Sequence, residues 1–254
     1  VRSIRVPNGG PGLAREAGRG VASGEFIQYL DSDDLLLPRK FELQVRAFEE
    51  QPECGVAYCI TRYRDAEGNE IECTWKPANQ IQRTIFPSFL VARWWETSTP
   101  LYRKSVCDAA GPWTALRLEE DWEYDCRVGA LGVELAYVDE VVAEHRDHEE
   151  GRLSRGSGAD PVRLRDRAAA HALIASHARR AGVPSDAPEF QRFARELFHL
   201  ARQCGGAGLA DEAKRLAALA RGISPAADIR IYEWAARVVG WRQAARAAAW
   251  IERR

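Results

Sequence analysis

The sequence predicts an α/β domain over residues 1–155, followed by an all-helical domain over residues 156–254. In the first part, short apolar runs that end in turn residues alternate with segments of helical spacing, which is typical of a sheet flanked by helices. The most distinct run extends from Phe26 to Leu30 and is followed by three aspartates at positions 31, 33 and 34. From about residue 160 onward, Ala, Arg and Leu dominate and strand patterns disappear.

The composition is that of an ordinary globular protein. The chain has 254 residues, 46% hydrophobic and 29% charged, which is enough for one large domain or two modest ones. It has no run of about 18 apolar residues, so the sequence predicts no transmembrane helix. Its six cysteines form no CxxC pair and have no histidine at zinc-ligand spacing. We therefore expect buried, reduced thiols and a cytoplasmic location.

Charge is divided unevenly between the two parts. Residues 1–150 contain 17 Lys and Arg against 27 Asp and Glu, a balance of −10, whereas residues 151–254 contain 19 against 10, a balance of +9. This asymmetry predicts two domains with different partners. The basic part, with amphipathic segments such as residues 229–251, is expected either to rest on an anionic membrane surface or to form a helical cap on the first domain. No nucleic-acid partner is expected.

Periodicity and turn residues place the individual elements. Helices are predicted at residues 13–22, 39–51, 118–131, 161–181, 187–203, 208–221 and 228–252. Strands are predicted at residues 1–6, 26–30, 56–61 and 133–142, with a hairpin turn at residues 65–69. The glycines of residues 7–12 fit neither a dinucleotide fingerprint nor a P-loop. The helix that follows this loop can still hold a phosphate with Arg15 as a bidentate partner, or Arg15 can lie on a solvated helix face.

The aspartates after residue 30 have two interpretations. Ligands collect at the carboxyl ends of strands in α/β sheets, and three acids at one such end repel one another unless a cation lies among them. Their hard oxygens suit Mg²⁺ or Mn²⁺ together with substrate phosphates, which indicates a metal–diphosphate site. Alternatively, Asp34 caps the helix that follows.

A second acidic cluster, residues 119–125, opens the helix predicted at 118–131. The helix dipole stabilises acids in a first turn, which accounts for them without any function; the alternative is that one of them faces the metal site as a base. His145 and His148 could bind a metal or a diphosphate, or be structural. The tryptophan pair at residues 94–95 could line a sugar pocket, although a place in the core is favoured.

Five motifs follow one another in a specific order across about 150 residues. They are Asn8-x-Gly10-x-x-x-Ala14-Arg15, Ala22-Ser-Gly24-Glu25-Phe26-Ile27, Leu30-Asp31-Ser32-Asp33-Asp34, Glu120-Asp121-Trp122-Glu123 and Arg146-Asp-His148. This order resembles the inverting GT-A glycosyltransferases of the family 2 type. The chain departs from the family at Glu16, where asparagine is usual. It is also expected to begin about a third of the way into the domain, without the first strand or strands.

The resemblance implies a GT-A fold, a mixed sheet flanked by helices, and a role for each matched residue. Asp31 and Asp33 are implied to form the DxD metal motif, with Asp33 as the closer ligand, and His148 to approach the metal or the diphosphate. Asp121 is implied to be the catalytic base. The residues implied to contact the nucleotide sugar are Arg15, Asp31, Asp33, Glu120, Trp122 and His148.

The chemistry of inversion suits these residue types. One carboxylate takes the proton of the acceptor hydroxyl, and the leaving diphosphate needs Mn²⁺ or Mg²⁺ and a cation such as Arg15 to bear its charge. Helical spacing places Asp121 and Asp125 on one face, with Glu120 and Glu123 elsewhere and Glu119 on an exposed first turn.

The expected reaction moves a sugar from a nucleotide-diphosphate sugar, with a UDP-sugar favoured, to a glycan or lipid-linked acceptor in polysaccharide biosynthesis. The expected location is cytoplasmic, with peripheral association at the inner face of the membrane. One alternative is a truncated, non-catalytic GT-A-like protein that acts through its basic helical domain. Another is a nucleotidyltransferase, but the Gly-rich signature with a basic end that opens such a domain is not found.

Overall fold

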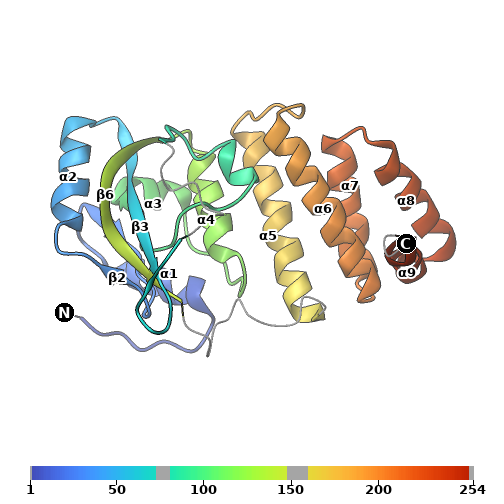
Figure 1. Cartoon of the computed structure of the whole chain (residues 1–254), viewed down its shortest axis with the longest axis horizontal. Coiled ribbons are helices and arrows are strands. Elements are labelled where there is room, and N and C mark those ends of the chain that lie inside the picture. Colours follow the sequence, from blue (N-terminus) through green and yellow to red (C-terminus); the bar gives the residue numbers. More distant parts are fainter. Residues whose placement is uncertain (1, 73–80, 148–159, 252–254) are drawn as a thin grey trace.

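The chain folds as an α/β part followed by a stack of helices, as expected. The computed structural model describes residues 2–72, 81–147 and 160–251. The sheet and its flanking helices occupy one end of an elongated molecule, and the later helices extend from it to the other end (Figure 1). The predicted fold class is therefore confirmed.

Within the described residues the sheet has the strand order β1-β5-β3-β6-β2, and β4 pairs with the far end of β3. The strands are β1 (Phe26–Gln28), β2 (Leu35–Leu36), β3 (Cys54–Arg64), β4 (Glu70–Ile71), β5 (Leu101–Arg103) and β6 (Glu134–Arg146). β3 and β6 are parallel and form the longest ladder, and the other pairs are antiparallel. β3 is buried almost continuously over its first half, as a central strand covered on both faces should be.

Helices flank this sheet and connect its strands. They are α1 (Pro11–Val21), α2 (Lys40–Glu50), the short 3₁₀ helix η1 (Ser88–Leu90), α3 (Lys104–Ala110) and α4 (Glu120–Gly129). α2 packs on β3 and β6 and buries Lys40, Gln44, Ala47 and Phe48, which share one helix face. Phe48 stacks on Phe26 of β1 with ring centroids 5.0 Å apart.

The second part contains α5 (Pro161–Arg180), α6 (Pro188–Gly206), α7 (Ala210–Ile223), α8 (Ala227–Val239) and α9 (Trp241–Ile251). α5 begins with a proline after Asp160, whose side chain accepts a hydrogen bond from Val162 N at 2.9 Å. The single helix expected at residues 228–252 is two helices. They are separated by Gly240, whose φ of 89° lies in the left-handed region that ends helices.

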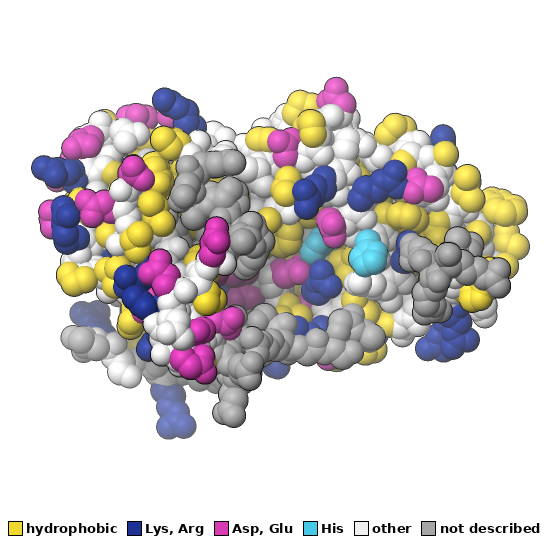
Figure 2. Space-filling model, in the orientation of Figure 1, with side chains coloured by type: hydrophobic (Ala, Val, Ile, Leu, Met, Phe, Trp, Pro, Cys, Tyr) yellow, Lys and Arg dark blue, Asp and Glu magenta, His cyan; other side chains and the backbone are white. Residues whose placement is uncertain are grey.

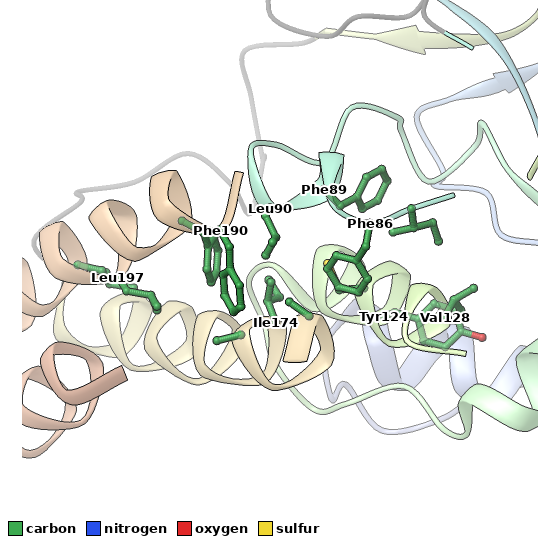
Figure 3. Close-up of a cluster of buried hydrophobic side chains, with 14 of the residues drawn as sticks. Phe86, Phe89, Leu90, Tyr124, Val128, Ile174, Phe190 and Leu197 are labelled. Carbon is green, nitrogen blue, oxygen red and sulfur yellow. The ribbon is translucent and has the colours of Figure 1, made fainter. Parts of the chain in front are cut away.

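One hydrophobic core runs through both parts of the molecule. Figure 3 shows the segment around Phe89 and helix α4 packed beside α5 and α6, with Tyr124 of α4, Ile174 of α5 and Phe190 of α6 among the buried side chains. The predicted boundary at residues 155 and 156 lies outside the described residues and stays a prediction.

Three local expectations can be compared with the structure. Residues 2–6 form no strand, and the sequence analysis missed β5 and α3. The hairpin turn at residues 65–69 is confirmed, with Asn69 N donating to Asp65 Oδ1 at 2.7 Å. The cysteines that the structure describes, namely Cys54, Cys59, Cys107, Cys126 and Cys204, are buried free thiols as expected, and Cys73 lies outside the described residues.

Candidate active site

Arg15 of α1 joins the two acidic clusters that the sequence singled out. Its Nη2 atom lies 2.6 Å from Asp31 Oδ1, just after β1, and its Nη1 atom lies 2.7 Å from Glu120 Oε1, at the start of α4. Burial opposes the charge of Arg15, but the two carboxylates outweigh it and raise the pKa of Arg15. The guanidinium also lies over the ring of Trp113, at 4.9 Å from the centroid. Arg15 is therefore part of a built polar site and not of a solvated helix face.

A glycine in the first turn of α1, Gly12, makes this contact possible. A Cβ atom on Gly12 would lie 2.5 Å from the backbone oxygen of Thr114 and 3.3 Å from Glu120 Cγ. A glycine at this position lets α1 approach the segment before α4 closely. This close approach brings Arg15 to Glu120, so Gly12 contributes to the packing of the site.

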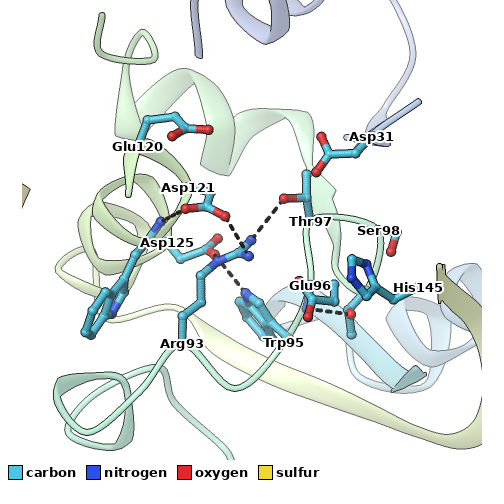
Figure 4. A network of polar contacts seen from close by, with 12 residues as sticks. Asp31, Arg93, Trp95, Glu96, Thr97, Ser98, Glu120, Asp121, Asp125 and His145 are labelled. Atoms are coloured by element: carbon cyan, nitrogen blue, oxygen red, sulfur yellow. Dashed lines mark hydrogen bonds and ion pairs between the residues drawn. The ribbon is translucent and has the colours of Figure 1, made fainter. Parts of the chain in front are cut away.

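A second polar network lies beside the first on α4. Arg93 Nη1 lies 2.9 Å from Asp121 Oδ2, and Arg93 Nε lies 2.7 Å from Asp125 Oδ2 (Figure 4). Asp125 also accepts hydrogen bonds from Trp95 Nε1 at 2.8 Å and from the Tyr102 hydroxyl at 2.5 Å. Burial opposes the charge of Arg93, but Asp121 and Asp125 raise its pKa well above the ordinary value. The buried Asp125 carboxylate therefore holds the side chains of Arg93, Trp95 and Tyr102 together.

The expected division of the acids along α4 is confirmed. Asp121 and Asp125 share the Arg93 face, whereas Glu120 turns to Arg15 and Glu123 turns to Arg127. The Asp121 side chain is 29% exposed and that of Asp125 only 1%. Asp121 is therefore the carboxylate of its pair that a second molecule can approach. Burial, followed by the negative charge of Asp121, raises the pKa of Glu120.

Trp122 packs against the hydrophobic core. Its Nε1 atom donates to the backbone oxygen of Phe89 at 2.9 Å, and its ring meets the ring of His171 of α5 edge-on. The backbone N–H of Trp122 donates to Asp121 Oδ1 at 2.8 Å. Trp122 therefore lies next to the candidate base while its ring is directed toward the helical part.

The expectation that Glu119 lies on an exposed turn is wrong. Glu119 is the N-cap residue of α4, with a left-handed φ of 59°, and its carboxylate lies 2.9 Å from Arg167 Nε and 2.8 Å from His171 Nδ1. Burial opposes ionisation of Glu119, but the interactions with His171 and Arg167 outweigh it and lower the pKa of the carboxyl. The helical spacing could not show this, because both partners come from α5.

Asp34 has a structural role that differs from the predicted cap. The N-cap residue of α2 is Arg39, and Asp34 is instead buried. It accepts a hydrogen bond from Ser98 Oγ at 3.0 Å and pairs with His145 Nδ1 at 2.8 Å. His145 therefore connects β6 to the turn after β1, and His148 lies outside the described residues.

Asp33 lies on the same turn as Asp31 and is half-buried. Its backbone oxygen accepts a hydrogen bond from Arg146 Nε at 2.5 Å, which connects the turn to the end of β6. In the described part of the chain, no group of three His, Cys, Asp or Glu ligand atoms within 4.8 Å of one another includes Asp31 or Asp33. The carboxylate oxygens nonetheless have the donor chemistry that Mg²⁺ and Mn²⁺ prefer, and the metal assignment stays a prediction.

Trp94 and Trp95 belong to the core, as the sequence analysis favoured. Both are buried and meet Phe89 in edge-on contacts. A small pocket beside them, lined also by Tyr58 and Tyr63, is far too small for a sugar ring.

The sequence analysis missed Arg93, His171 and His177. Arg93 stands before the tryptophan pair without any motif of its own, and its acidic partners lie 28 and 32 positions further on. His177 Nε2 meets Glu123 Oε1 at 2.8 Å across a separation of 54 positions. Contacts of this range leave no periodic signal in one sequence, so only the fold could reveal them.

Comparison with known proteins gives matches to glycosyltransferases over the first part of the chain. Residues 1–107 match the model of the family "Glycosyl transferase family 2", and the match ends before α4. A protein of Rickettsia bellii (strain RML369-C), described as an uncharacterized glycosyltransferase, is 40% identical over 92 residues, which cover 35% of this chain and 13% of that protein. The chain thus spans a small part of this relative's length, and the similarity to glycosyl transferase family 2 covers residues 1–107.

Solved structures show the same fold over nearly the whole chain. S. aureus TarS 1–349 in complex with UDP-GlcNAc matches with a TM-score of 0.61 and 17% identity, covering 97% of this chain and 74% of that one. Another TarS structure matches with a TM-score of 0.58 and 16% identity, covering 96% and 44%. The GT-A fold with following helices, expected from the resemblance, is therefore confirmed. Among the described helices, none has the length and hydrophobicity that a membrane span requires.

Proposed function

We propose that this protein transfers a sugar from a UDP-sugar to a hydroxyl group of a glycan or lipid-linked acceptor, with inversion at the anomeric carbon. One observation carries the proposal: Arg15 binds Asp31 and Glu120 together, directly beside Asp121, on a GT-A fold with a family 2 sequence. UDP-GlcNAc in the complex with TarS supports a UDP-sugar as the donor.

In this proposal Asp121 is the general base. The carboxylate takes the proton of the acceptor hydroxyl as the hydroxyl oxygen attacks the anomeric carbon, and such a base contributes about 10²–10⁴-fold in rate. Arg93 at 2.9 Å and the N–H of Trp122 at 2.8 Å hold the two oxygens of Asp121. Because Arg93 is largely buried and the N–H of Trp122 belongs to the backbone of α4, these two contacts keep the carboxylate in one orientation toward the donor.

In this proposal, Arg15 stabilises the negative charge of the leaving diphosphate. Asp31 and Glu120 hold the guanidinium in place, so its positive charge is in position before the donor arrives. Asp31, Asp33 and His148 would hold Mn²⁺ or Mg²⁺, which as a Lewis acid stabilises the developing negative charge. Glu120 acts at the nucleotide sugar through Arg15, which it holds in place. The ring of Trp122 packs in the core, so Trp122 contributes through the N–H that holds Asp121.

A donor panel tests this proposal. The protein is incubated with UDP-, GDP- and dTDP-sugars, a polysaccharide acceptor and Mn²⁺, and the released nucleoside diphosphate is measured. We expect release from a UDP-sugar that depends on the acceptor and stops when EDTA removes the metal. No release from any donor, together with no calorimetric binding of UDP, would favour the non-catalytic protein that acts through its helical part.

A further inference from the structure

Large hydrophobic side chains are exposed mainly at the far end of the helical part. Among the described residues, seven large hydrophobic side chains are more than half exposed, and five of them lie in α8 and α9. They are Ile231, Trp234, Val238, Val239 and Trp250, which we call the α8–α9 face. Scattered apolar side chains are normal on a protein surface, whereas this concentration on two adjacent helices indicates an interaction surface.

The spacing of these side chains places most of them on one side of α8. Ile231, Trp234 and Val238 are three and four residues apart and therefore share a helix face. The opposite face, with Ile229 and Ala236, is buried against the molecule. In Figure 2, hydrophobic side chains are visible at the end of the molecule where α8 and α9 lie.

The charges around the α8–α9 face are predominantly basic. Among the described residues of α8 and α9, the exposed cations are Arg230, Arg242 and Arg246, together with Arg237, which is paired with Glu233. Both acids of α8 form ion pairs with arginines. Asp228 pairs with Arg195, and the buried Glu233 pairs with Arg221 and Arg237. The surface therefore offers apolar and positively charged groups together, including exposed indole rings.

We propose that the α8–α9 face docks the protein peripherally on a membrane that contains anionic lipids. Tryptophans favour the boundary between headgroups and acyl chains, and arginines there bind lipid phosphates while their stems lie on the apolar layer. A second copy of the chain is a poorer occupant, because a symmetric contact would bring the arginines of both copies together. Helices α8 and α9 lie at the end of the molecule opposite the sheet (Figure 1), so docking through them leaves the GT-A part open to a soluble donor.

Vesicle co-sedimentation tests the proposal and does not depend on the proposed reaction. The protein is mixed with vesicles of phosphatidylcholine and phosphatidylglycerol, or of phosphatidylcholine alone, at low and high salt. We expect binding to the anionic vesicles that weakens with salt. The double variant Ile231→Ser/Trp234→Ser should bind about tenfold more weakly or worse, because it removes two apolar contacts. Arg242→Gln/Arg246→Gln should bind more weakly and lose part of the salt dependence.

The matched control is Ile81→Ser/Val162→Ser, which removes two side chains that are equally exposed but lie elsewhere. It should sediment with vesicles like the parent. Three results would overturn the proposal: no binding to anionic vesicles at low salt, equal binding by the α8–α9 variant, or equal loss of binding by the control. A concentration-dependent dimer that Trp234→Ser abolishes, seen by analytical ultracentrifugation without any vesicle binding, would assign the face to a second copy instead.

Discussion

At the scale of single residues, Arg93 holds together the polar network that includes the candidate base Asp121 and the buried Asp125. Its side chain is 10% exposed, and Asp125, one of its two partners, is 1% exposed. Replacing Arg93 by methionine leaves the buried Asp125 carboxylate without its cation, which costs about 3–5 kcal/mol for pairs of this kind. Urea unfolding should show this loss.

The control for Arg93 is Arg39→Met, because the pair of Arg39 with Glu140 is about half exposed. Its effect should stay within about 1 kcal/mol. Equal unfolding midpoints for the Arg93 and Arg39 variants would mean that the buried network contributes little to stability.

Asp33 carries the second prediction at this scale. If it is the closer metal ligand, Asp33→Ala should abolish the Mn²⁺-dependent part of UDP binding while the circular dichroism spectrum stays unchanged. Isothermal calorimetry with and without Mn²⁺ measures this. Asp186→Ala, at an exposed position between α5 and α6, is the matched control. Unchanged Mn²⁺-dependent binding in Asp33→Ala would remove Asp33 from the metal site.

At the scale of elements, helix α5 holds the start of α4. Arg167 and His171 bind Glu119, and His177 binds Glu123, so two carboxylates on either side of Asp121 are fixed from α5. Burial opposes ionisation of Glu123, but His177 and Arg127 outweigh it, and its pKa is lowered like that of Glu119. The position of the candidate base therefore depends on the helical part.

These lowered pKa values predict how stability changes in acid. A carboxyl group with a lower pKa in the folded state stabilises that state above its ordinary pKa, near 4.5, and loses this contribution as the pH falls through the folded value. The free energy of unfolding should thus fall more steeply with acidification in the parent than in Glu119→Gln. Urea unfolding between pH 3 and pH 7 measures both slopes, and equal slopes would contradict the ion pairs with α5.

The sequence predicted elements where the pattern was local. The strand at Phe26 and helices α5–α7 follow from apolar runs, spacing and turn residues. β5 and α3 were missed because they are only 3 and 7 residues long and no turn residue separates them. The ordered motifs identified Arg15, Asp31, Glu120 and Asp121 as candidate site residues. Arg93 was missed because its role depends on contacts between segments that are distant in the sequence.

At the scale of the whole molecule, the shared core predicts that the α/β part and the helices unfold together. Phe190 of α6 is 1% exposed and belongs to the same buried cluster as Tyr124 of α4. Phe190→Ala should cost about 3–5 kcal/mol. Tryptophan fluorescence and far-ultraviolet circular dichroism should follow one common transition at a lower temperature. Two separate transitions, with only one of them shifted, would show that the parts are independent.

The matched control for this variant is Phe41→Ala on α2, because Phe41 is 49% exposed and lies outside the shared core. It should lower the transition temperature much less than Phe190→Ala. The uneven charge of the sequence predicted two parts with different partners, but composition alone could not show that they share one core.

The measurement that tests the account most directly is a comparison of rate and donor binding in Asp121→Asn. Because a general base acts on the acceptor proton, this variant should lose at least about 10²-fold in the rate of sugar transfer while its calorimetric affinity for the UDP-sugar stays within about twofold. Asp186→Asn, with an equally conservative change at an exposed site, should transfer sugar at the parent rate. If Asp121→Asn also transfers sugar at close to the parent rate, Asp121 is not the base, and Glu120 becomes the next candidate.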